Sequence, residues 1–241
     1  MSTNTQETII EKVRAILDRA NHPNTPQAEA ETALALAQRL ITKYSLDESA
    51  LRDHVEDEKI VKDSIVVTGP YALRRLGVLG AVARANSCGC YRTTYFDPQW
   101  SENKHGRPQR EKKGYTLHIF GTEADIFSVK VLWQSVELLA LRSIPKGDKS
   151  FRHSWWLGFA DGIRRALSKA NTQAVEESGG NALVLVNRLN RAEEEMGATV
   201  KLRSVVTTGA RRRDAYTSGQ STGASFSTNG VGRGAIGALG R

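Results

Sequence analysis

Five cationic residues lie within ten positions of one another: Lys104, Arg107, Arg110, Lys112 and Lys113. Cations at this spacing bind phosphate groups, and a protruding β-ribbon with a proline near its tip can follow a nucleic-acid groove. Pro108 would then act as the wedge. The alternative is a solvated hairpin loop whose charges keep a sheet edge from aggregating. The residues alone leave both hypotheses open.

A second cationic group, Arg211-Arg212-Arg213, opens a segment rich in Gly, Ser and Thr. Arginine in glycine-rich sequence is common in proteins that bind single strands and RNA, where it adds phosphate contacts. The alternative is a disordered tail that only improves solubility. Gly219 and Gly223 do not form a phosphate loop, because no Gly-Lys-Ser/Thr sequence follows them.

Asp97, Glu111 and Lys113 resemble the carboxylates and lysine with which nucleases hold Mg²⁺ and position a water. Such chemistry requires both carboxylates within about 4 Å of one metal. Glu111 falls in a charged segment that we expect to be a loop, where nothing would fix its geometry. A Mg-dependent nuclease is therefore the lesser alternative, and we expect no catalytic residues.

Four zinc-type ligands, Cys88, Cys90, His105 and His118, fall on one expected hairpin. The Cys-x-Cys spacing differs from the usual two-residue knuckle, and a histidine within an apolar strand is more often a core residue. The two cysteines are two apart on a strand, without favourable disulfide geometry, so we expect reduced thiols. We expect no metal and no cofactor.

Trp155, Trp156 and Phe159 accompany Gly158 and Gly162, which are four positions apart. Glycines at this spacing permit a close helix contact between subunits, and the tryptophans could stack on bases. Because adjacent residues on a helix point about 100° apart, core packing of at least one tryptophan is the simpler interpretation.

The charge of the chain is asymmetric. Residues 1–60 hold 7 Lys or Arg against 11 Asp or Glu, whereas residues 61–241 hold 27 against 15. An acidic head on a basic body favours a polyanion as the partner of the body. No run approaches the roughly 20 apolar residues of a membrane span. We therefore expect a soluble, cytoplasmic protein without a membrane partner.

Apolar periodicity predicts the elements that must position these residues. Residues 8–45 form a helical hairpin, and a short third helix passes through Leu51 and Val55. In the body we expect strands over 61–68, 88–96, 115–120, 182–186 and 199–206, with a long polar loop joining the second and third. Helices are expected over 71–86, 122–144, 149–175 and 189–196.

The head resembles a family. Its sequence from Glu11 to Leu17, and then from Glu29 to Tyr44 after a proline-containing turn, is similar to the family called domain of unknown function 2786. The stretches 117–126 and 151–160 are similar to the region that often follows this head, so the resemblance extends over residues 8–170. It implies a fold neighbourhood and a phage or actinobacterial origin, and it supplies no activity or catalytic residues.

These observations predict an α+β protein with a helical head (1–58), a basic body containing a small mixed sheet with flanking helices (59–207), and a Gly/Ser/Arg-rich tail (208–241). The function that we expect is non-enzymatic binding of the nucleic-acid backbone, with DNA favoured over RNA, by a phage-encoded protein. The alternative is a protein that acts through a protein partner at residues 8–45. A homo-oligomer fits either function.

Overall fold

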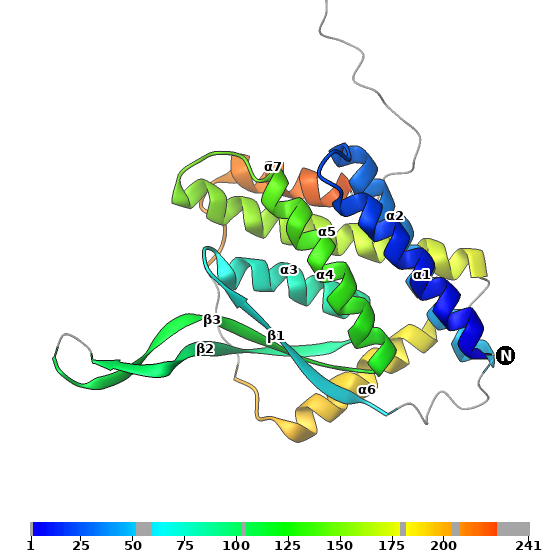
Figure 1. The fold of residues 1–241 in the computed structure, drawn as a ribbon, viewed down its shortest axis with the longest axis horizontal. Helices are drawn as coiled ribbons and strands as arrows, with labels where there is room; N and C mark the ends of the chain where they lie inside the picture. Colours follow the sequence, from blue (N-terminus) through cyan, green and yellow to red (C-terminus); the bar gives the residue numbers. More distant parts are fainter. Residues whose placement is uncertain (1, 52–58, 103–104, 179–181, 204–207, 226–241) are drawn as a thin grey trace, which may run out of the picture.

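The computed structural model describes residues 2–51, 59–102, 105–178, 182–203 and 208–225. Seven helices and three strands follow one another in these ranges (Figure 1). Their order is α1 (Ser2–Asn21), α2 (Gln27–Leu51), β1 (Val61–Thr68), α3 (Ala72–Ala85), β2 (Gly89–Glu102), β3 (Pro108–Gly121), α4 (Glu123–Ser143), α5 (Lys149–Ser178), α6 (Leu183–Thr199) and α7 (Arg213–Ala224). The α+β class is confirmed.

The expected helical hairpin is present as α1 and α2. Its apolar stripe, which includes Leu17 and Leu34, is buried in the main core together with residues of α3, α4 and α5. The expected break near Ser45 is wrong. Because neither Gly nor Pro occurs between positions 45 and 51, α2 continues to Leu51, and Val55 lies outside the described residues.

The three strands pair in the order β1-β3-β2. Every pairing among them is antiparallel, where we expected a mixed sheet. Successive residues of β3 face opposite sides, so that Leu117 and Ile119 join the main core while Phe120 packs against Ala192 of α6. The sheet therefore lies between α6 on one face and the other helices on the opposite face (Figure 1).

The predicted strand over 182–186 is wrong, because Leu183 begins α6. A short apolar run does not distinguish a strand from a helix. The helical spacing of Arg188, Ala192 and Met196 decides here, since all three are buried on one side of the helix and the last two pack against Phe120 of the sheet. The predicted strand over 199–206 is also wrong for residues 200–203, which form neither helix nor strand, and 204–207 lie outside the described residues.

Part of the expected flexible tail is the helix α7, which packs along α5. A Cβ atom added at Gly158 would overlap the carbonyl oxygen of Tyr216, and one added at Gly219 would overlap that of Trp155. Glycine therefore allows the two backbones to touch. The close helix contact that we expected at Gly158 and Gly162 is thus made within the chain, and residues 226–241 lie outside the described residues.

Trp155, Trp156 and Phe159 are all fully buried in the main core. Because that core includes residues of the head and body alike, the boundary near residue 58 does not separate two cores among the described residues. The division into three domains stays a prediction. None of the described helices combines the length and the apolar character that crossing a membrane requires.

Candidate nucleic-acid interface

The segment with five cations is a two-stranded ribbon and not a loop. Strands β2 and β3 continue past the sheet to Glu102 and Pro108, and the ribbon extends away from the helices (Figure 1). We call residues 96–112 the arm. Arg107, Arg110, Lys112 and Lys113 are exposed, and Lys104 lies outside the described residues. A ribbon is therefore present at the charge cluster, with Arg110, Lys112 and Lys113 on β3 and Arg107 just before it.

Two irregularities in the pairing shape the arm. The register shifts on either side of Phe96, and Pro98 falls in the unpaired stretch between Phe96 and Trp100. A proline is tolerated there because an unpaired position requires no backbone amide donor. The backbone amide of Gln99 donates to Oδ1 of Asp97 (2.9 Å), and Nε of Arg110 donates to the Asp97 carbonyl (2.7 Å). These bonds fix the bend of the arm.

Aromatic side chains accompany the cations on this ribbon. Phe96 is paired with Lys112, and Trp100, which is 69% exposed, is paired with Arg110. Directly opposite residues share one face of a ribbon, and residues two apart on one strand do so too. One face of the arm thus presents two exposed aromatic rings, each beside a cation. Single-stranded nucleic acids are bound by surfaces of this composition.

The residues of the nuclease hypothesis do come together. Nζ of Lys113 lies 2.8 Å from Oε2 of Glu111 and 3.5 Å from Oδ2 of Asp97. Glu111 belongs to β3 and not to a loop, which corrects our expectation. The carboxylates are exposed on the ribbon, and the cavity beside Lys113 is lined by neither of them. The single positive charge of Lys113 is thus shared between two carboxylates.

A cavity of about 810 Å³ lies where the arm joins the body. We call it the arm-base cavity. Its polar lining comes from three elements: Arg74 of α3, Lys112 and Lys113 of β3, and Lys149 and His153 of α5. All of its lining residues belong to the described part of the chain, and no Asp or Glu is among them. This surface attracts anions.

Arg74 is the deepest cation of this cavity, with 7% of its surface exposed. Its Nε donates to Nε2 of His153 (2.7 Å), and its Nη2 donates to the carbonyl and hydroxyl oxygens of Thr208 (both 3.0 Å). Within the described ranges it has no carboxylate partner. Burial lowers the pKa of Arg74, and the positive charge of Arg92 lowers it further.

Nε2 of His153 accepts the hydrogen bond from Arg74, so this nitrogen carries no proton and the ring is neutral. Burial lowers the pKa of His153, and three neighbouring cations lower it further: Arg74, Arg211 and Lys149. Lys149, His153 and Arg211 also line an adjoining cavity together with Thr208. The two cavities connect the base of the arm to the segment that precedes α7.

The three consecutive arginines have different roles. The backbone amides of Arg211 and Arg212 both donate to Oγ of Ser154 (3.1 Å), which holds this segment against α5. The side chain of Arg212 pairs with Asp214 (2.7 Å) and approaches Asp148 (3.8 Å). Arg213 is exposed at the start of α7. Only Arg211 therefore contributes its charge to the cavities.

Of the four residues considered for zinc, His118 has other partners, Cys88 and Cys90 are thiols, and His105 is exposed in a turn of the arm. Burial raises the pKa of Cys88 well above the ordinary thiol value and also raises that of Cys90. His118 stacks on Tyr91, with 4.6 Å between the ring centres, and hydrogen-bonds to Thr93. Across the ranges that the structure describes, no three His, Cys, Asp or Glu side chains gather as metal ligands would.

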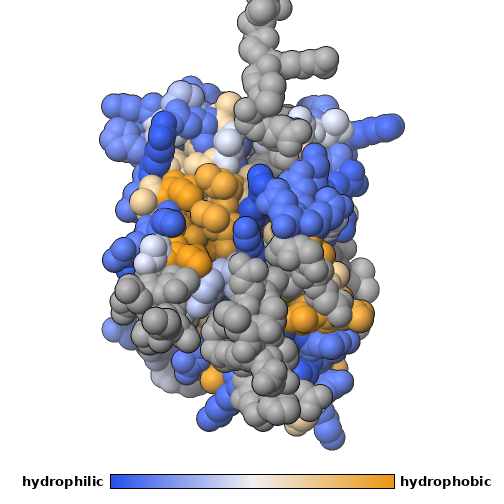
Figure 2. Space-filling model, turned by 90° about the vertical axis from the view of Figure 1, so that its right-hand side faces the viewer, coloured by the Kyte–Doolittle hydropathy of each residue, from blue (hydrophilic) through white to orange (hydrophobic). Residues whose placement is uncertain are grey.

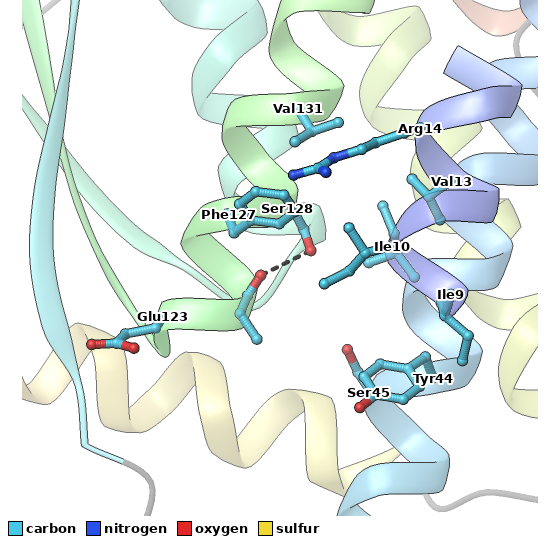
Figure 3. A pocket seen from close by; sticks show the side chains of 12 residues that line it. Ile9, Ile10, Val13, Arg14, Tyr44, Ser45, Glu123, Phe127, Ser128 and Val131 are labelled. Atoms are coloured by element: carbon cyan, nitrogen blue, oxygen red, sulfur yellow. Dashed lines mark hydrogen bonds between the residues drawn. The ribbon is translucent and has the colours of Figure 1, made fainter. Parts of the chain in front are cut away.

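An apolar groove of about 360 Å³ lies between α1, α2 and α4. Figure 2, which views the molecule from the side of α1, shows exposed apolar side chains gathered on this face. Ile9, Ile10 and Val13 line the groove from the head, and Phe127 and Val131 line it from α4 (Figure 3). Arg14 and Glu123 lie on opposite sides of it (Figure 3).

The charge cluster led to the arm but not to Arg74, Lys149 or His153. A local signal existed for two of them, because Lys149 and His153 are four apart at the start of a helix and so share a face. Arg74 carried no such signal. The exposed ring of Trp100 was also missed, although it lies four residues before Lys104 in the sequence.

Residues 8–48 match the family model described as "Protein of unknown function (DUF2786)". The resemblance of the head is thereby confirmed over residues 8–48, which include most of α1 and of α2, and its extension to residue 170 stays a prediction. No curated protein and no solved structure matches the chain.

Proposed function

We propose that the protein binds the phosphate backbone of nucleic acids without catalysing a reaction, using the arm and the cavities at its base. The observation that carries this proposal is the convergence of cations from distant parts of the chain on the carboxylate-free lining of the arm-base cavity. A ribbon with exposed aromatic rings leads away from this surface. Backbone contacts with few base contacts give binding of low sequence selectivity.

DNA as the favoured nucleic acid, a phage origin and a place in the host cytoplasm belong to the same proposal. They rest on the resemblance of the head to a family that occurs in phages.

The experiment is fluorescence anisotropy with labelled single- and double-stranded DNA and RNA, measured across a range of salt concentrations. The variant replaces Lys104, Arg107, Arg110, Lys112 and Lys113 by Ala. Each lost phosphate contact reduces the slope of log affinity against log salt by about 0.7 to 0.9. In a separate variant, Trp100→Ala weakens single-strand binding by about 1–3 kcal/mol if the ring stacks on a base.

The matched control also removes five positive charges, from exposed lysines elsewhere: Lys12, Lys43, Lys59, Lys169 and Lys201. We expect it to bind better than the arm variant, because net charge acts only through screened, long-range attraction. Equal losses in both variants would show that the arm has no special role. Failure of the intact protein to bind any of the four nucleic acids near physiological salt would refute the proposed function.

The apolar groove favours a second candidate function, interaction with a protein through the head. We propose a second copy of the chain as the occupant. Arg14 and Glu123 lie on opposite sides of the groove, so a two-fold arrangement would bring the Arg14 of each copy toward the Glu123 of the other. Phe127, which is 38% exposed, supplies apolar surface for this contact.

A further inference from the structure

The arm-base cavity gathers donors that no sequence pattern links. We infer that this cavity binds a single phosphate group, held by Arg74, Lys112, Lys149 and His153. The inference rests on the proposed function, since it takes this phosphate from the nucleic acid that lies along the arm. It goes further in assigning one structured phosphate site where the arm joins the body, which adds Arg74, Lys149 and His153 of the body to Lys112 of the arm.

Arg74 is the first reason. A buried charge is costly unless it is paired, and the described residues provide Arg74 with neutral partners only. Its hydrogen bonds use Nε and Nη2, so Nη1 remains to donate to a ligand. A phosphate in the cavity would supply the missing negative charge. Guanidinium groups favour phosphate because their fork of donors matches its oxygens.

The start of α3 is the second reason. This helix begins at the cavity without a side-chain cap. The amides of Ala72 and Arg74 donate to the carbonyls of Gly69 and Tyr71, so Leu73 provides the amide for a ligand. Tyr71, just before the helix, has a positive φ of 58°, which is unusual for a residue other than glycine. The first peptide groups of a helix carry a partial positive charge that favours an anion. By contrast, α5 is capped by Asp148, which accepts from the amide of Phe151 (2.7 Å) and does not line the cavity.

The number and spread of the donors select phosphate among anions. Cationic groups reach the cavity from α3, β3 and α5, and Arg211 adds another in the adjoining cavity. The two oxygens of a carboxylate lie in one plane, whereas the oxygens around a phosphorus atom point in tetrahedral directions and so can meet donors that converge from three elements. The volume of about 810 Å³ leaves room for the sugar attached to that phosphate.

His153 provides a readout of occupancy. Charged groups face its ring from three sides: Arg74 on α3, Arg211 before α7, and Lys149 on its own helix. A bound phosphate offsets these charges and attracts the guanidinium of Arg74 away from Nε2 of His153, so this nitrogen can accept a proton and binding is accompanied by proton uptake. Affinity for phosphate should accordingly increase as the pH falls through the pKa of His153 in the complex.

The experiment follows the ring signals of His153 by NMR while inorganic phosphate is added, with sodium chloride at matched ionic strength as the reference. The variant His153→Gln identifies these signals among those of the five histidines. We expect a saturable shift and a higher pKa of His153 with phosphate only. Lys149→Gln should weaken phosphate binding by about 5-fold, whereas Lys146→Gln, an exposed residue three positions away, should leave it unchanged.

Arg74→Gln should abolish the shift of the His153 signals on addition of phosphate. Circular dichroism of this variant verifies that it folds. If it does not fold, the comparison of Lys149→Gln with Lys146→Gln decides, because both side chains are exposed. The same shift with chloride, or equal affinities in the two lysine variants, would overturn the phosphate site.

The outcomes separate this site from the proposed function. Nucleic-acid binding without a response of His153 to phosphate overturns the site and leaves the arm as the binding surface. Phosphate binding without nucleic-acid binding overturns the proposed function alone. Oligonucleotides with and without a 5′-phosphate then show which phosphate of the nucleic acid occupies the cavity. Tighter binding of the phosphorylated strand indicates the phosphate at a chain end. Equal binding of both strands, with a shift of the His153 signals, indicates an internal phosphodiester.

Discussion

Gln38 shows how single polar residues connect the head to the body. Its side chain is fully buried, and Nε2 lies within hydrogen-bonding distance of oxygens on Thr42 (3.2 Å), Asn86 (3.4 Å) and Asn171 (3.0 Å). Asn171 in turn donates to the carbonyl of Ala85 (2.7 Å). The network joins α2, the end of α3 and α5. Oε1 of Gln38 is buried without a hydrogen-bond partner among the described residues, so the side chain is satisfied on its donor side only. Buried polar groups of this kind specify a unique packing because each unpaired group is costly.

We expect Gln38→Ala to lower the free energy of unfolding by about 2 kcal/mol, since Asn86 and Asn171 lose a donor in a buried position. Urea denaturation followed by tryptophan fluorescence measures the change. The control Lys43→Ala, at an exposed position of the same helix, should stay within about 0.5 kcal/mol of the intact protein. Equal stabilities of all three proteins would mean that the network is not formed.

The contact between α5 and α7 shows what small residues do for an element. The paired glycines bring the backbones together, and Ala215 adds a small buried side chain between the helices. The composition of this segment predicted disorder, because the segment contains few large apolar residues. A helix that packs through its backbone needs few of them.

Gly158→Ala should displace α7, because the new Cβ would overlap the carbonyl oxygen of Tyr216. Overpacking of this kind costs about 1–3 kcal/mol. We expect faster amide hydrogen exchange and earlier proteolytic cleavage within residues 213–224. Gly197→Ala is the matched control, because a Cβ at that helical position meets nothing within 4 Å. Unchanged exchange in Gly158→Ala would contradict the close packing of the two helices.

At the scale of the molecule, the two candidate surfaces lie on different elements. The arm and its basal cavities belong to β2, β3, α3 and α5, whereas the apolar groove belongs to α1, α2 and α4. Binding of nucleic acid and self-association therefore need not compete. This separation allows each surface to be altered alone.

Sedimentation velocity over a range of protein concentrations tests self-association through the groove. We expect a concentration-dependent dimer that Phe127→Ser weakens, because this substitution removes exposed apolar surface from the contact. Phe96→Ser is the matched control, since Phe96 is similarly exposed on the arm. A monomer at every concentration would overturn self-association, as would equal weakening by both substitutions.

The sequence by itself determined most of the elements and the charge of the arm. Periodicity and capping depend on residues within a few positions of one another, so the head hairpin and α4, with Thr122 accepting from the amide of Asp125, were predictable. Local patterns were insufficient where packing decides the structure. The apolar run at the start of α6 suits a strand as well as a helix, and the glycines of α7 gain a role only against α5.

Only the tertiary structure decided where the cations meet. Arg74, Lys113, His153 and Arg211 are far apart in the sequence, and antiparallel pairing, the start of α5 and the docking of α7 bring them to two adjoining cavities. Electrostatic attraction depends on distances in space, which no linear spacing records. The sequence therefore indicated a basic body, whereas the fold determined which of its charges act together.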